Sequence, residues 1–181
     1  MRRIFSAVIV VFPMLPGATV AAEPAARGRT FIRALEVFDA AKTPQEEQRY
    51  LYALTGFRPA ALVRQTLDRT LNGEIRTQDA PFVIRSLLTS VHGRALAWEF
   101  FKANWERMNQ AFPMTGIRRM CDGVTGLATP EWERDVREFF TRNRVDLGGK
   151  TLPQILEQLH IAVLLRGREG AALHEYLRRD Q

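Results

Sequence analysis

The chain of 181 residues is 46% hydrophobic and 25% charged, a composition that fits one globular domain and excludes a disordered or collagen-like protein. Its net charge is +6, but basic and acidic residues are interleaved, which argues against a nucleic-acid-binding protein. Cys121 is the single cysteine, so no internal disulfide can form, and we expect it to be a small buried residue.

The first residues have the pattern of a signal peptide. Arg2 and Arg3 precede a short apolar run that two prolines interrupt, and small residues lead to a cleavage site near Ala22. We therefore expect export to the periplasm or the medium, with no membrane span after cleavage. Two alternatives to a cleaved signal peptide remain. The segment is an uncleaved anchor, or it results from a truncated gene and the protein stays in the cytoplasm. The expected segments are a signal peptide at 1–22, a linker at 23–28 and a helical domain at 29–181.

Beyond this start, apolar residues recur with the helical period, and no stretch alternates as a strand would. Thr43, Pro44 and Glu46 form a capping box that marks one helix start, and Thr129-Pro130 marks another. Besides the helix that starts at Thr43, helices are expected at about 30–41, 60–72, 79–91, 94–111, 116–127, 131–143, 152–166 and 170–179. Short connections between them favour antiparallel neighbours, in either a bundle or an irregular stacked α-solenoid.

One aromatic stripe runs along the longest expected helix. Its members recur at steps of three and four residues and are Trp98, Phe101, Trp105, Met108 and Phe112. Such a stripe is compatible with a cofactor site, but at helical spacing it is more typical of core, and we predict core.

The stretch GEIRTQDAPF, residues 73–82, concentrates polar groups and raises the question of an active site. Gly73 stands where a left-handed helix cap is needed, and Thr77 or Asp79 can cap the next helix. Turn chemistry accounts for most of these groups, so we interpret the stretch as a turn between two helices.

The sequence carries no catalytic signature. No two of the histidines, His92, His160 and His174, lie within four residues of each other, so no helical pair of zinc ligands exists. The pair His174-Glu175 begins like HExxH, but Arg178 occupies the last position of that motif. Neither a phosphate-binding glycine loop nor a G-x-S-x-G elbow is present. We predict no catalytic residues, no metal site and no cofactor.

Several segments together resemble the C-terminal helical domain of zinc aminopeptidases, the family of aminopeptidase N, puromycin-sensitive aminopeptidase and the endoplasmic-reticulum aminopeptidases. They are QEEQRYLYAL (45–54), GEIRTQDAPFVI (73–84), GRALAWEFFKANWERM (93–108), GVTGLATPEWERDVREFF (123–140) and HEYL (174–177). The resemblance implies an all-α, irregular superhelix of antiparallel HEAT-like helix pairs that encloses a peptide chamber. It covers roughly the terminal half of that domain, and the family's HExxH and G-x-M-E-N motifs have no matching positions here.

The expected function is therefore a non-catalytic module that binds peptide or protein. Arginine suits carboxylates because its planar fork offers paired donors, which makes Arg49, Arg58 and Arg76, near expected helix ends, candidate contacts for a peptide carboxylate. Solvated surface arginines are the alternative. A second hypothesis is a detached part of an aminopeptidase, or a gene remnant, that needs a separate catalytic chain.

The first helix of the domain suggests a partner surface. Phe31, Leu35 and Phe38 lie on one side of it, whereas Ile32 and Val37 lie more towards the other. A single core does not easily cover both sides. We expect a homodimer or a hetero-complex formed through residues 28–57.

Overall fold

The computed structural model describes residues 24–145 and 147–179, and the expected signal peptide lies outside these ranges. Within them the chain is all-α and contains no strand, as predicted. The elements are α1 (Pro24–Asp39), α2 (Pro44–Leu54), α3 (Ala60–Arg69), α4 (Ala80–Thr89), α5 (Arg94–Ala103), α6 (Trp105–Ala111), α7 (Met114–Asp122), the 3₁₀ helix η1 (Gly123–Gly126), α8 (Pro130–Arg142) and α9 (Thr151–Arg179).

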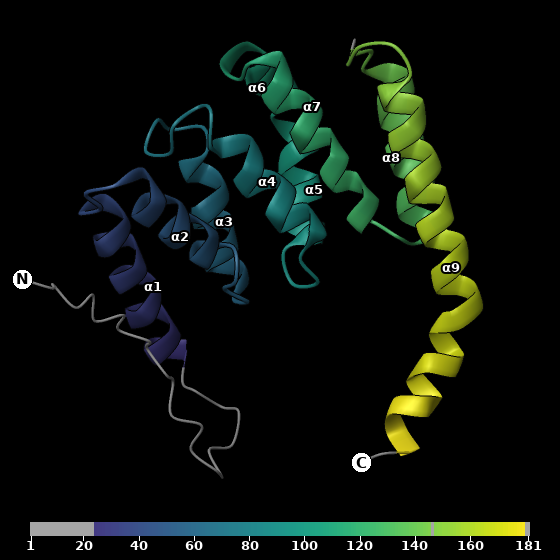
Figure 1. Ribbon diagram of the computed structural model, residues 1–181, viewed down its shortest axis with the longest axis horizontal. Coiled ribbons are helices and arrows are strands. Elements are labelled where there is room, and N and C mark those ends of the chain that lie inside the picture. The colour runs from purple at the N-terminus through teal and green to yellow at the C-terminus, as the bar shows by residue number, and fades with distance from the viewer. Residues whose placement is uncertain (1–23, 146, 180–181) are drawn as a thin grey trace, which may run out of the picture.

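The helices follow one another across the molecule in chain order, from α1 at one end to α9 at the other (Figure 1). Chain neighbours pack together in the pairs α1–α2, α4–α5, α6–α7 and α8–α9. Contacts between α2 and α4, α3 and α5, and α7 and α9 join successive pairs. Contact between elements close in the chain is what an irregular α-solenoid requires, because each helix pair meets its neighbours along the stack.

Helix starts follow the predicted capping chemistry. The Thr43 hydroxyl accepts a hydrogen bond from the Glu46 amide at 3.2 Å, and the Glu46 carboxylate accepts one from the Lys42 amide. Thr129 caps α8 in the same way, through the Trp132 amide. Gly73 has φ +92°, the left-handed conformation expected after α3. The stretch that it opens is therefore a turn between α3 and α4.

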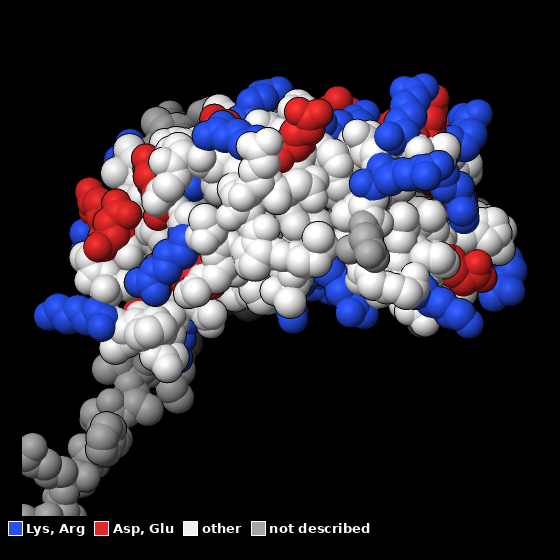
Figure 2. All heavy atoms as spheres, turned by 90° about the horizontal axis from the view of Figure 1, so that it is seen from above, with Lys and Arg blue, Asp and Glu red and all other residues white. Residues whose placement is uncertain are grey.

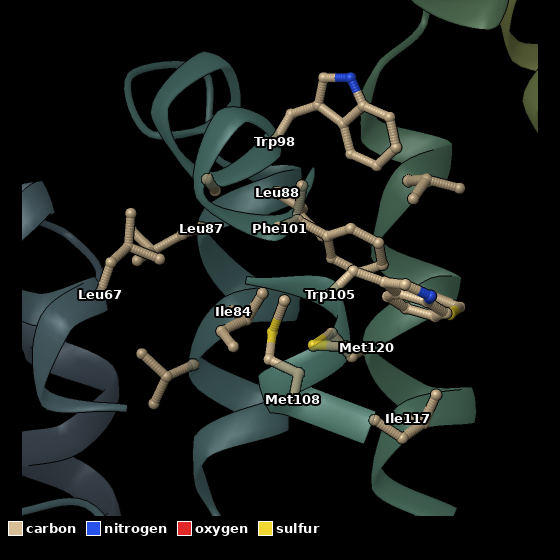
Figure 3. Packing of buried hydrophobic residues seen from close by; sticks show 14 of the residues in the cluster. Leu67, Ile84, Leu87, Leu88, Trp98, Phe101, Trp105, Met108, Ile117 and Met120 are labelled. Carbon is tan, nitrogen blue, oxygen red and sulfur yellow. The ribbon is translucent and has the colours of Figure 1, made fainter. Parts of the chain in front are cut away.

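The aromatic stripe is core, as predicted. Trp98, Phe101 and Met108 have no exposed surface and belong to one buried cluster with side chains of α4 and α7 (Figure 3). Phe139 of α8 packs edge-on against Trp98 at 5.3 Å and against Trp105 at 5.5 Å between ring centroids. The stripe therefore binds α8 to the central helices.

Three predicted helix boundaries are wrong. The first helix, α1, begins at Pro24, inside the expected linker 23–28, and not at about residue 30. The helix expected at 94–111 is broken at Asn104, whose side-chain amide donates to the Phe100 carbonyl and separates α5 from α6. The helices expected at 152–166 and 170–179 are one continuous helix, α9, which runs through Gly167 and Gly170. Glycine lowers helix propensity by about 1 kcal/mol, which is too little to end a helix by itself.

Two glycines allow α4 to lie unusually close to its neighbours. A Cβ at Gly116 would stand 2.8 Å from the Pro81 ring, and one at Gly126 would stand 2.6 Å from the Leu88 carbonyl oxygen. Both separations are below van der Waals contact. Glycine at these positions therefore fixes the approach of α7 and η1 to α4.

In α1, Phe31, Leu35 and Phe38 are buried, whereas Ile32 is 56% exposed and Val37 is half-buried. This is the division between two sides that the sequence predicts. Seen from the top of Figure 1, acidic and basic side chains intermingle along the edges of the molecule around a largely uncharged middle (Figure 2). Among the described helices, none combines the length and the apolarity that crossing a bilayer demands.

Candidate functional site

An open cleft of about 420 Å³ lies where α4, α7 and α9 meet. Its lining is mainly polar and consists of Arg85, Thr115, Arg118, Arg119, Asp122, Thr151, Gln154, Ile155 and Gln158. Thr151 and Ile155 are buried, whereas the arginines and the glutamines are exposed. We call this feature the basic cleft, because three arginines share it with one carboxylate.

One of the three arginines is already paired. Arg85 of α4 donates from Nε and Nη2 to the same Asp122 oxygen, at 3.1 and 2.9 Å. Both side chains are more than 40% exposed, so the pair adds little stability. It does hold the Arg85 guanidinium at one wall of the cleft, while the second Asp122 oxygen accepts no hydrogen bond from the described residues.

The other two arginines come from adjacent positions of α7. The Arg119 guanidinium lies 4.6 Å from the ring centroid of Phe82, a cation–π distance that fixes its position. Arg118 has no hydrogen-bond or ion-pair partner among the described residues. The cleft therefore contains one unengaged guanidinium fork and a net charge of +2 from its charged side chains.

The α9 wall supplies amides. Gln154 and Gln158 are one helical turn apart and line the same cleft as Arg118. A primary amide both donates and accepts, as a peptide bond does. Guanidinium groups beside amides can hold a carboxylate together with the peptide group next to it.

The predicted candidates Arg49, Arg58 and Arg76 do not line this cleft. Arg49 and Arg58 are exposed, and Arg76 forms an ion pair with Glu47 at 2.9 Å. Sequence reasoning missed the cleft residues. The adjacent arginines 118 and 119 were the available signal, but no sequence pattern relates them to Arg85 or to the glutamines of α9.

A second polar cluster joins α5 to α8. The Asp135 carboxylate accepts from the Trp98 indole at 2.7 Å and from the Lys102 ammonium at 2.8 Å. Burial alone would raise the pKa of Asp135, but these hydrogen bonds outweigh it and hold the pKa below its ordinary value. The cluster satisfies the buried indole and fixes α8, so its role is structural.

A third cluster joins α8 to α9. Nδ1 of His160 lies 3.0 Å from Oε1 of Glu133, which also accepts from Arg137 at 2.9 Å. Burial would raise the pKa of Glu133, but the hydrogen bonds from Arg137 and His160 lower it overall. Because the groups are mutually satisfied and lie on a packed helix pair, they too support the fold.

The cysteine and the other two histidines lie outside these clusters. Cys121 is fully buried, as predicted, and burial raises the pKa of its thiol to about 12, which keeps it from acting as a nucleophile. His92 and His174 are exposed. Within residues 24–145 and 147–179, no three His, Cys, Asp or Glu side chains form a group that could hold a metal ion.

The order and packing of the helices define the class: an all-α domain whose helix pairs contact their neighbours along the chain. The ERAP1-like C-terminal domain family matches residues 18–161, and the chain belongs to this family. The resemblance to the C-terminal helical domain of zinc aminopeptidases is confirmed.

The similar full-length proteins are aminopeptidases. Aminopeptidase N of Bos taurus is 33% identical over 100 residues, which cover 54% of this chain and 10% of the relative. Aminopeptidase M1-A of Oryza sativa subsp. japonica is 30% identical over 129 residues, which cover 70% of this chain and 14% of the relative. Leucyl aminopeptidase of Saccharolobus solfataricus is 32% identical over 109 residues, which cover 59% of this chain and 14% of the relative. The chain thus spans only a small part of each relative.

Proposed function

We propose that the chain is a non-catalytic helical domain that binds peptides and holds a peptide carboxylate in the basic cleft. The observation that carries the proposal is the unengaged Arg118 fork beside Arg119 and Arg85. A carboxylate at Arg118 would form two charge-assisted hydrogen bonds, about twice as strong as neutral ones.

Two further features favour a peptide over a free inorganic anion. Gln154 and Gln158 offer the donors and acceptors that a peptide backbone needs. The relatives are named aminopeptidases, so the domain belongs to a family whose full-length members act on peptides.

The test compares one peptide as its free acid and as its C-terminal amide by calorimetry. We expect the free acid to bind at least about tenfold more tightly, and Arg118→Gln to remove that difference. Arg49→Gln is the matched control, because Arg49 is exposed and lies outside the cleft. Equal affinity of acid and amide for the unmodified chain would refute carboxylate recognition.

A second candidate function is to complete an aminopeptidase whose catalytic part is a separate chain. It is favoured by the family to which the chain belongs and by relatives that are named aminopeptidases. We expect the chain alone to leave aminoacyl chromogenic substrates intact in the presence of zinc, since the sequence has no HExxH. Stable co-purification with a chain that contains HExxH would support this candidate. Chelator-sensitive turnover by the purified chain alone would contradict both candidate functions.

We also propose that the protein works outside the cytoplasm, on the basis of the signal-like residues 1–22. Expression with the native start should give a periplasmic or secreted product that begins at or near Glu23. A soluble cytosolic product with Met1 intact would contradict export and favour the gene-truncation alternative.

A further inference from the structure

The basic cleft contains two guanidinium groups that no carboxylate of the described residues neutralises. Asp122 neutralises Arg85, so Arg118 and Arg119 account for the net charge of +2. Arg118 has no partner among the described residues, and Arg119 lies over the ring of Phe82 without forming an ion pair to any of them. An aromatic ring supplies no acceptor oxygen, so both guanidinium groups still have N–H groups to donate.

The position of Asp122 accounts for the free state of both arginines. Asp122 lies four positions after Arg118 and three after Arg119 on α7, the spacings at which opposite charges on one helix pair with each other. Its carboxylate is held instead by Arg85 of α4, through Nε at 3.1 Å and Nη2 at 2.9 Å. Arg85 is therefore a positioning residue, because it keeps this carboxylate away from the two arginines of α7.

Arg118 and Arg119 enter the cleft from different directions. Consecutive positions of a helix differ by about 100° around its axis, yet both side chains line the same cleft. Two forks that converge from different sides suit two separate carboxylates better than one carboxylate shared between them. A single carboxylate would also leave one of the two cations without a neutralising charge.

We propose that the basic cleft selects peptides whose C-terminal residue is Asp or Glu. This inference rests on the proposed function, which places the terminal carboxylate at Arg118, and it adds a second subsite in which Arg119 binds the side-chain carboxylate. Both carboxylates of such a residue are ionised at neutral pH, so its two charges match the net charge of the cleft. Gln154 and Gln158 then face the preceding peptide groups, to which amides both donate and accept.

The lining favours an acidic last residue over an apolar or a basic one. Among the described residues that line the cleft, Ile155 is the one with an apolar side chain, and it is only 4% exposed. A large apolar side chain would therefore displace water from the guanidinium groups without replacing the hydrogen bonds that they lose. A basic side chain would add a further positive charge to a cleft that already has an excess of two.

The test uses one peptide sequence in four forms, which end in Glu or Gln and carry either a free acid or a C-terminal amide. Calorimetry with the full chain measures the affinity of each form at neutral pH. We expect the free acid that ends in Glu to bind about tenfold more tightly than the free acid that ends in Gln. Arg119→Gln should abolish this preference for Glu and preserve the preference for acid over amide, which depends on Arg118. Arg134→Gln is the matched control, because Arg134 is an exposed residue of α8 that does not line the cleft.

A second pair of variants tests the positioning role of Arg85. Arg85→Gln should weaken binding of the Glu free acid by about threefold or more, because Asp122 is then free to pair with the arginines of α7. Adding Asp122→Asn should restore the affinity, since the competing carboxylate is removed. A double variant that binds as weakly as Arg85→Gln alone would contradict the positioning role.

The outcomes separate this inference from the proposed function. If the Glu and Gln free acids bound equally while each bound more tightly than its amide, the inference would be overturned and the proposed function would stand. Equal affinity of acid and amide for both peptides would refute the proposed function, and the inference with it. A preference for Glu that survives Arg119→Gln, or displacement of the Glu peptide by inorganic phosphate at equal concentration, would also overturn the inference.

Discussion

In α4, six of ten residues are buried, whereas in α9 only four of twenty-nine are. The central helix meets α2, α3, α5, α7 and η1, while α9 contacts η1, α7 and α8 and extends beyond them. Helical periodicity is present in both helices. The difference shows that an apolar stripe forms a core only where neighbouring elements come close enough to cover it.

This comparison separates two kinds of stability. The centre depends on close packing, which a single altered side chain disturbs, whereas the second half of α9 depends on helix propensity and on whatever it meets in solution. Substitutions in the two regions should therefore differ in size and, at the glycines, in sign.

The largest difference should come from aromatic truncation. Trp98→Ala should reduce the free energy of unfolding by about 3 to 5 kcal/mol, and Trp105→Ala by a similar amount, because each removes a buried ring and leaves a cavity. Denaturant unfolding followed by circular dichroism measures the change, on a spectrum that should be dominantly helical. An unchanged midpoint for both variants would place the stripe on a surface and contradict the packing described above.

Glycine replacement should change stability in opposite directions. Gly126→Ala should destabilise by about 1 to 3 kcal/mol, because its Cβ would meet the backbone of α4. Gly167→Ala should stabilise by about 0.5 to 1 kcal/mol, since nothing lies within 4 Å of its Cβ position and alanine is the better helix former. The melting temperatures of the two variants test this prediction. If both substitutions raised the melting temperature, or both lowered it, the predicted difference between the two glycines would be wrong.

A smaller effect should appear at the cluster that fastens α8 to the centre. The folded pKa of Asp135 is lowered, so its contribution is present above its unfolded pKa of about 3.9 and is lost as pH falls through the folded value. Asp135→Asn should therefore destabilise by about 1 kcal/mol or less at pH 7, because the site is partly solvated. Urea unfolding measures the stability difference between Asp135→Asn and the unmodified chain, which should be smaller near pH 3 than at pH 7. An equal stability difference at both pH values would contradict this account.

The smallest effect should lie on the second half of α9, where no described side chain is buried. Leu173→Ala should change the free energy of unfolding by no more than about 0.5 kcal/mol, because Leu173 is 58% exposed. Leu67→Ala in α3 is the buried counterpart and should destabilise by about 2 to 5 kcal/mol. Comparable losses of unfolding free energy at Leu173 and Leu67 would mean that the second half of α9 is buried against another surface.

Sequence periodicity was enough to predict the all-α fold, the capped helix starts and the buried stripe, because these depend on local spacing. It failed at Asn104, where a side chain satisfies a backbone carbonyl while the stripe continues unbroken. It failed again at Gly167 and Gly170, where a propensity penalty does not end the helix.

The basic cleft was beyond sequence reasoning for a different reason. Its side chains come from three elements, and residues as far apart as Arg85 and Gln158 line the same cleft through tertiary packing, to which the close approach of α7 and α4 at Gly116 contributes. The candidates Arg49, Arg58 and Arg76 were chosen by position near helix ends, which says nothing about which surfaces converge.

Because Cys121 is buried, the rate at which its thiol is modified can be used to measure local opening of the protein. A thiol-reactive reagent can modify this side chain only after local opening around α7, since Cys121 itself has no exposed surface in the closed form. The modification rate, measured against that of a small-molecule thiol, would yield the free energy of that opening without any added label. Because no second cysteine competes for the reagent, the kinetics would report a single event.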